Sequence, residues 1–231
     1  MNDKILEIEE ERDFTISKIE QFCFIATALF FSRKYVCNSA DTIYHNPETI
    51  VFPYNNELFL NNFKTIKNQQ PELLKENGFG DLVNKMIIVS SASVLENYLR
   101  KIGKLFELNK DKIKPCQACR HRKEPLPHSF DGLARRFKDK DMRIEKIEEY
   151  EQSYLLTLIR HKINHNRGNA DRDFIKNVKS LSCKESEHFS NIERRSPIST
   201  PIDEIILPCL EKSNRFVKKS AVLFISQLEE V

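Results

Sequence analysis

The sequence has 231 residues, of which 40% are hydrophobic and 31% charged, with five glycines, nine prolines and no tryptophan. This length suffices for one substantial hydrophobic core or two small ones. Few glycines and long runs of helix-forming residues argue against a sheet fold, so we predict an all-α protein. No segment approaches 18 uninterrupted apolar residues, and the N-terminus is acidic where a signal peptide is basic. We therefore expect a cytoplasmic protein that is not embedded in a membrane, with reduced cysteines.

The net charge of +3 is too small to predict a nucleic-acid binder by itself, but the charge is unevenly distributed. Residues 1–13 hold two basic and six acidic side chains, whereas residues 110–146 hold twelve basic and six acidic ones. The basic middle of the chain either attracts phosphate groups or forms a solvated face.

The N-terminal part, residues 1–78, is predicted to be a helical region of unknown function. Apolar residues at helical spacing predict one long helix from about residue 3 to residue 33. Two prolines and several β-branched residues predict a loop over 36–55, with or without a short extended piece. A second helix is expected over about 57–68.

The remainder, residues 79–231, is predicted to be one helical domain. Its clearest helix covers residues 82–108, where apolar positions return every three or four residues and Ser90–Ser93 would allow close approach of another helix. Three prolines and no periodicity predict an inserted loop over 109–130. Further helices are expected at about 131–137, 141–165, 171–179 and 201–228, with a polar loop over 181–200.

The inserted loop carries a candidate metal site. Cys116 and Cys119 form a C-x2-C pair whose thiolates can bind one zinc ion, and His121 and His128 could complete four ligands. The second knuckle of the usual zinc sites is absent, so reduced thiols without a metal are the alternative. Basic residues beside this pair suit phosphate contacts in either case, namely Arg120, Arg122 and Lys123.

A second cluster lies at the expected C-terminal end of the helix over 141–165. It contains Arg160, His161, Lys162, His165 and Arg167. Inside a core these groups would need buried partners, whereas beside a phosphodiester guanidinium binds phosphate oxygens and imidazole transfers protons near neutral pH. Two histidines at i,i+4 could also form half of a zinc site, but no HExxH glutamate or third ligand is near.

This cluster resembles a known motif. Arg160 and His165, with four residues between them, resemble the R-x4-6-H signature of the HEPN superfamily, all-helical domains of which many are metal-independent endoribonucleases. Residues 86–100 (MIIVSSASVLENYLR) and 160–175 (RHKINHNRGNADRDFI) are similar to two helical elements of RiboL-PSP or MAE-type HEPN domains. The similarity covers about residues 80–230. Arg122 and His128 also fit the spacing, but two prolines between them exclude a helix.

The resemblance implies a HEPN-like helical bundle that forms a homodimer, with the two motif helices meeting at a cleft. His165 would transfer the proton of an RNA 2′-hydroxyl, and Arg160 would hold the scissile phosphate, giving a cyclic phosphate and a 5′-hydroxyl without a catalytic metal. Secondary contacts are implied for His161 and Asn164. Glu96, on the earlier helix, is a candidate to orient Arg160 or His165, although it could equally be a surface charge. Lys162 and Arg167 are candidates for RNA contacts.

Stand-alone HEPN proteins are often bacterial toxins or antiphage effectors, which implies an antitoxin or a defence-complex partner. Some HEPN toxins have a tyrosine two residues after the histidine that a partner enzyme modifies, but this chain has Arg167 there. The alternative function is a non-catalytic helical module that binds RNA, a nucleotide or a protein, and a third is a structural dimerisation domain.

Overall fold

The computed structural model describes residues 2–45, 79–108 and 129–229, and within these ranges the secondary structure is helical. Its one strand-like feature in that part of the chain is an isolated bridge between Asn169 and Pro197. The prediction of an all-α fold is therefore confirmed. Four helices of 16 or more residues make up most of the structure: α1 (Asn2–His45), α3 (Phe79–Leu105), α5 (Tyr150–His165) and α8 (Leu207–Glu229). Shorter elements connect them: α4 (Phe130–Lys138), η2 (Ile144–Lys146), α6 (Arg172–Val178), α7 (Lys184–Glu187) and η3 (Ile202–Ile206).

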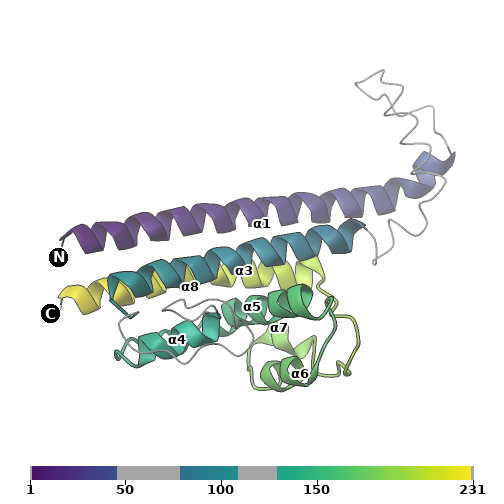
Figure 1. Cartoon of the computed structure of the whole chain (residues 1–231). Helices are drawn as coiled ribbons and strands as arrows, with labels where there is room; N and C mark the ends of the chain where they lie inside the picture. The colour runs from purple at the N-terminus through teal and green to yellow at the C-terminus, as the bar shows by residue number, and fades with distance from the viewer. Residues whose placement is uncertain (1, 46–78, 109–128, 230–231) are drawn as a thin grey trace.

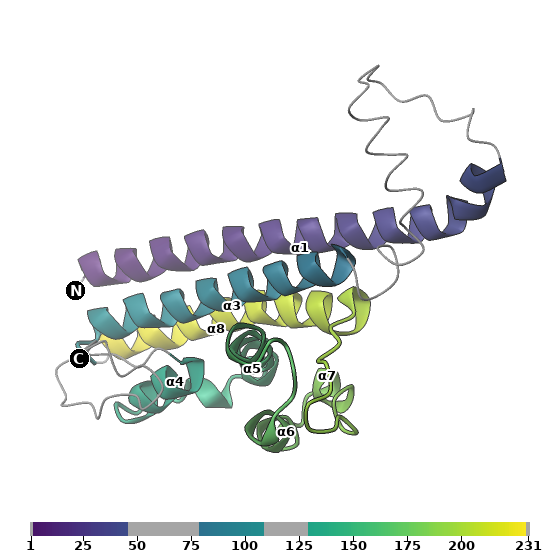
Figure 2. The ribbon, with the colours of Figure 1, turned by 45° about the vertical axis from the view of Figure 1, so that its right-hand side comes forward.

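The three longest helices lie side by side, with α1 packed against both α3 and α8 (Figures 1 and 2). Ile8, Thr15, Ile19 and Ala26 are fully buried, and their spacing of seven, four and seven residues places them on one face of α1. Polar contacts join the start of α1 to the end of α3: Lys4 donates to the Leu105 carbonyl at 3.1 Å, and Lys101 pairs with Glu11 at 2.6 Å. The described helix of the N-terminal region thus shares one core with the rest of the bundle, while the domain boundary at residue 78 stays a prediction.

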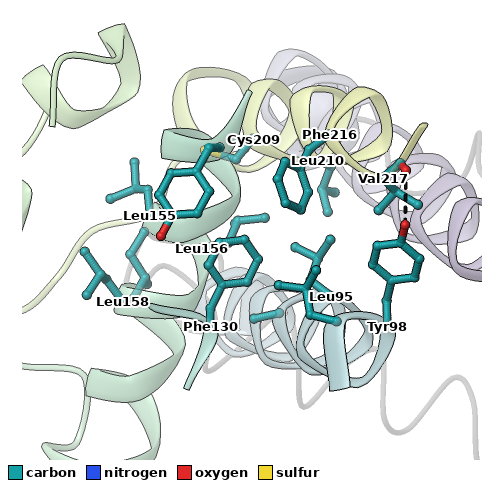
Figure 3. Packing of buried hydrophobic residues seen from close by; sticks show 14 of the residues in the cluster. Leu95, Tyr98, Phe130, Leu155, Leu156, Leu158, Cys209, Leu210, Phe216 and Val217 are labelled. Carbon is teal, nitrogen blue, oxygen red and sulfur yellow. Dashed lines mark hydrogen bonds between the residues drawn. The ribbon is translucent and has the colours of Figure 1, made fainter. Parts of the chain in front are cut away.

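Helix α5 crosses beneath α3 and α8, so that Figure 2 looks almost along its axis while the long helices lie across the view. The core fills the space where these helices meet, and Figure 3 shows Leu95 of α3, Leu156 of α5 and Phe216 of α8 converging there. Two pairs of polar groups inside this core are hydrogen-bonded: the Tyr98 hydroxyl lies 3.1 Å from the Ser220 hydroxyl, and Ser153 donates to Ser213 at 3.1 Å. The polar groups therefore connect the same helices that the apolar ones do.

Two predicted segments were wrong. Residues 36–45, expected as a loop, continue α1 to His45, where the following Asn-Pro dipeptide disfavours helix. The helix expected from residue 141 begins only at Tyr150, because Asp141 takes a left-handed φ of 62° that ends the preceding turn. The chain then turns inward and buries Met142 and Ile144.

The other expected helices in the described ranges are present to within a few residues, and the polar loop over 181–200 contains the single-turn helix α7. The loop over 46–55, the helix over 57–68 and residues 109–128 lie outside the described residues. None of the described helices is long and apolar enough to cross a bilayer.

Packing of α1 against the bundle predicts different effects for two apolar residues of α1. Ile19→Ala removes a fully buried side chain and should lower the free energy of unfolding by about 2–5 kcal/mol. Phe24→Ala, at a position that is 75% exposed, should change it by about 0.5 kcal/mol or less. Urea denaturation of both variants measures the difference, and equal effects would contradict this packing.

Candidate functional site

The last turns of α5 meet α3 through a largely buried ion pair. The Arg160 Nη1 atom lies 2.6 Å from Oε2 of Glu96, and their side chains are 20% and 6% exposed. Arg160 also donates to the Ser93 hydroxyl at 3.4 Å. The structure therefore brings Glu96 to Arg160, as the sequence analysis proposed, and Glu96 is not a surface charge.

The environment of Glu96 opposes its own ionisation. Burial raises the pKa of the Glu96 carboxyl above its ordinary value, and the cations of Arg160 and Arg100 counteract this only in part. A hydrogen bond from the backbone of Phe130, the first residue of α4, acts in the same direction as the cations. Arg160 is thus held by a carboxylate in a partly desolvated position, which limits the directions its guanidinium can take.

The imidazoles of His161 and His165 lie together on the exposed side of α5. Their ring centroids are 4.6 Å apart, because residues four apart are neighbours on a helix surface. Burial lowers the pKa of His161 below its ordinary value of 6.5, and the neighbouring groups Lys162, His165 and Arg160 lower it further against the attraction of Asp171. His161 is therefore neutral at pH 7 and able to accept a proton.

Arg160 and His165 do not point the same way from the helix. Five residues correspond to about 140° around the axis and about 7.5 Å along it. Asn164, four residues after Arg160, lies close to the direction of Arg160 and is exposed. A ligand group bound by Arg160 would therefore lie away from His165 of the same chain.

Lys162 faces the interior. Its side chain is 8% exposed, and its Nζ atom lies 2.6 Å from Oδ2 of Asp171. Asp171 also caps α6, since its other carboxylate oxygen accepts from the Phe174 N–H at 2.8 Å. Burial raises the pKa of Asp171, but these two hydrogen bonds and the Lys162 charge outweigh it and leave the pKa below its ordinary value. Lys162, expected as an RNA contact, is instead bound inside the fold, whereas Arg167 is exposed.

The structure does not place the residues of the inserted loop. Cys116, Cys119, His121, His128, Arg120, Arg122 and Lys123 lie outside the described residues. Among those that are described, no group of three or more histidine, cysteine, aspartate or glutamate side chains is arranged to hold a metal ion.

Comparisons of this chain with protein-family models, with curated proteins and with solved structures found no match. The resemblance to HEPN domains therefore rests on the residues of the chain itself.

The sequence did not predict that Ser93 and Asp171 are partners in this region. The small size of Ser93 predicts only that another helix can approach it closely. Asp171 stands at the expected start of a helix, where aspartate is a common N-cap, so its position predicts the capping role. Its second role, as the partner of Lys162, required the turn that brings residue 171 back beside α5.

The Lys162–Asp171 pair predicts unequal effects of removing either partner. Asp171→Ala leaves a buried ammonium without a counter-charge and α6 without its cap, and should lower the free energy of unfolding by about 3 kcal/mol. Lys162→Met keeps the cap and most of the packing, and should lower it by about 1 kcal/mol or less. Chemical denaturation compares the two, and a larger loss for Lys162→Met would contradict the buried placement.

The lowered pKa of His161 predicts how stability depends on pH. Below pH 6.5 the unfolded chain takes up a proton at this residue that the folded chain binds less readily. The contribution of His161 to stability should therefore be complete above pH 6.5 and decrease as the pH falls through this value. His161→Asn should flatten the fall in the free energy of unfolding between pH 7.5 and pH 5.5. An NMR titration in which the His161 ring titrates above 6.5 would contradict this.

Proposed function

We propose that this protein is a metal-independent endoribonuclease of the HEPN type. The observation that carries the proposal is the arrangement near the end of α5. Glu96 holds the guanidinium of Arg160 in place, and the imidazoles of His161 and His165 lie exposed on the same helix. A fixed guanidinium suits a phosphate, and a neutral imidazole suits the removal of a hydroxyl proton. Neither group needs a metal ion to act in this way.

The reaction follows from these groups. His165 accepts the proton of a ribose 2′-hydroxyl while the 2′-oxygen attacks the adjacent phosphorus. The bond from phosphorus to the 5′-oxygen breaks, and this oxygen takes a proton from a protonated imidazole. Arg160 binds the phosphate oxygens and stabilises their increased negative charge. The products are a 2′,3′-cyclic phosphate and a 5′-hydroxyl. His161 and Asn164 support the site as a further proton acceptor and a polar contact.

A second copy of the chain completes the centre. Arg160 and His165 diverge by about 140° around α5, so Arg160 of one copy and His165 of the other can face one phosphate when two helices meet. Leu82 and Met86 are 56% and 60% exposed, and they share the face of α3 on which Ser93 contacts Arg160. An exposed apolar strip beside the proposed centre suits the contact between two copies.

In the cell, this activity would make the protein a toxin or an antiphage effector of the cytoplasm, controlled by an antitoxin or a defence-complex partner. Control by nucleotide transfer to a tyrosine is not proposed, because Arg167 stands at that position. The contact with Glu96, where α3 and α5 cross, keeps Arg160 oriented before RNA binds.

Replacement of the two central residues tests the proposal. Arg160→Ala and His165→Ala should each reduce cleavage of single-stranded RNA by about 100-fold or more, since each removes an interaction with one transition state. The double variant should be no worse than either single one. Arg160→Lys should also fail, because a point charge lacks the planar fork of guanidinium. Product analysis should show cyclic phosphate ends, and EDTA should leave the rate unchanged.

Matched controls use residues of the same type elsewhere. His188→Ala and Arg215→Ala remove a histidine and an arginine whose partners are Glu204 and Glu211, and both variants should cleave RNA at the wild-type rate. Cleavage that is unaffected by Arg160→Ala and His165→Ala, or that requires added magnesium, would overturn the proposal. RNA binding without turnover by the wild-type chain would indicate the non-catalytic module instead.

A further inference from the structure

Two tight turns beyond the end of α5 lie at opposite ends of one short antiparallel pairing. In the first, the Asn169 N–H donates to the Asn166 carbonyl at 3.0 Å, with Arg167 and Gly168 at the central positions. In the second, the Ser196 N–H donates to the Glu193 carbonyl at 3.2 Å, with Arg194 and Arg195 at the central positions. Both turns therefore present arginine at their tips.

Backbone hydrogen bonds join the two turns into one unit. The Ile198 N–H donates to the Gly168 carbonyl at 2.8 Å, and the Ala170 N–H donates to the Ser196 carbonyl at 2.9 Å. The Arg195 N–H donates to the Ala170 carbonyl at 2.8 Å, so the second turn is attached directly to the segment that leaves the first. The isolated bridge between Asn169 and Pro197 is the centre of this pairing. Arg167 and Arg195 therefore lie at opposite ends of this short pairing.

The backbone at these arginines has an unusual conformation. Arg167 has a φ of 53° and Arg195 a φ of 72°, both in the left-handed region that glycine and asparagine favour. Gly168, with a φ of 77°, is the expected residue type for such a position. Turn geometry by itself therefore favours glycine or asparagine, and not arginine, at residues 167 and 195.

The side chains of Arg167, Arg194 and Arg195 are exposed, and their charges have no partner within the described part of the chain. Within the described ranges, no hydrogen bond or ion pair engages the guanidinium of Arg167, Arg194 or Arg195, whereas Arg135, Arg160 and Arg215 are each paired with a carboxylate. Asp171, the acid that follows the first paired segment, is already bound to Lys162. Three unpaired cations on a rigid support favour a polyanionic ligand.

We propose that Arg167, Arg194 and Arg195 form a phosphate-binding surface, here called the double-turn surface, for single-stranded RNA that extends away from the proposed cleavage centre. This inference rests on the proposed function, because Arg167 is two residues from His165 and the bound RNA is taken to extend from the cleavage centre at His165. Neither turn carries an aromatic side chain, so the surface contacts the sugar-phosphate backbone and not the bases. It therefore increases affinity for longer RNA without adding sequence preference.

The test measures RNA binding and cleavage separately. Binding is measured by fluorescence anisotropy in a His165→Ala background, with a single-stranded oligoribonucleotide about 16 nucleotides long. Arg194→Ala with Arg195→Ala should raise the Kd about tenfold near physiological salt and reduce the slope of log Kd against log salt by about 1.4. Cleavage of a dinucleotide, which has one phosphodiester and cannot reach the second turn, should keep its wild-type kcat/KM in the corresponding variant with His165 intact.

Two control variants separate a binding role from a structural one. Lys140→Ala with Arg143→Ala removes two exposed cations before the opposite end of α5, and it should leave the Kd unchanged. Arg195→Gly suits the φ of 72° and should unfold at the same or a higher temperature than the wild type, yet still weaken binding to the long RNA.

The outcomes distinguish this inference from the proposed function. An unchanged Kd for the double variant, or equal weakening by the Lys140 and Arg143 control, overturns the double-turn surface even if Arg160 and His165 prove essential for cleavage. Weaker binding of the double variant together with cleavage that does not depend on Arg160 or His165 supports the surface and overturns the proposed centre. Loss of dinucleotide cleavage in the double variant would also overturn the surface as an extended binding region.

Discussion

A carboxylate that is 6% exposed remains ionised inside a protein only when a cation and hydrogen bonds meet it there, and at Glu96 this role belongs to Arg160. The pair joins the middle of α3 to the last turns of α5, and removal of either partner would leave the other with an uncompensated charge. Because the burial of Glu96 raises its pKa, the pair is a constraint on geometry more than a source of stability. It holds the guanidinium of Arg160 at the place where α5 crosses α3, next to the outward-facing side chains of the following turn.

The end of α5 separates its polar residues into inner and outer sets. Lys162 points inward to Asp171, which also caps α6, so one carboxylate closes the turn after α5 and starts the next helix. His161 and His165 lie outside, with their rings 4.6 Å apart. The buried contacts hold the turn rigid, and the exposed groups remain available to a ligand. The proposed nuclease centre and the double-turn surface both depend on this division, since each needs exposed cations or imidazoles on a fixed support.

Helical periodicity was sufficient to predict most of the fold. The apolar spacing of α3 and α8 and the cap at Asp171 each left a local pattern in the sequence. The errors arose where local patterns compete with other forces. Residues 36–45 contain β-branched residues and asparagine, which lower helix propensity by small amounts, and no proline interrupts them. Ile144 and Ile147 are three residues apart, as in a helix, but the chain reverses at Asp141 and forms only the short element η2 there.

The sequence by itself determined that this protein is helical and that Arg160 and His165 lie at the end of one helix, because both follow from residue order within a single element. It also indicated Glu96 as a partner, through a resemblance and not through any local rule. Only the tertiary structure decided that Lys162 is buried on Asp171, and that two arginine-bearing turns separated by some 27 residues are joined by backbone hydrogen bonds. Such contacts depend on how the chain returns to itself after α6 and α7. No periodicity or spacing within one segment encodes that path, since it is set by the burial of side chains from several helices at once.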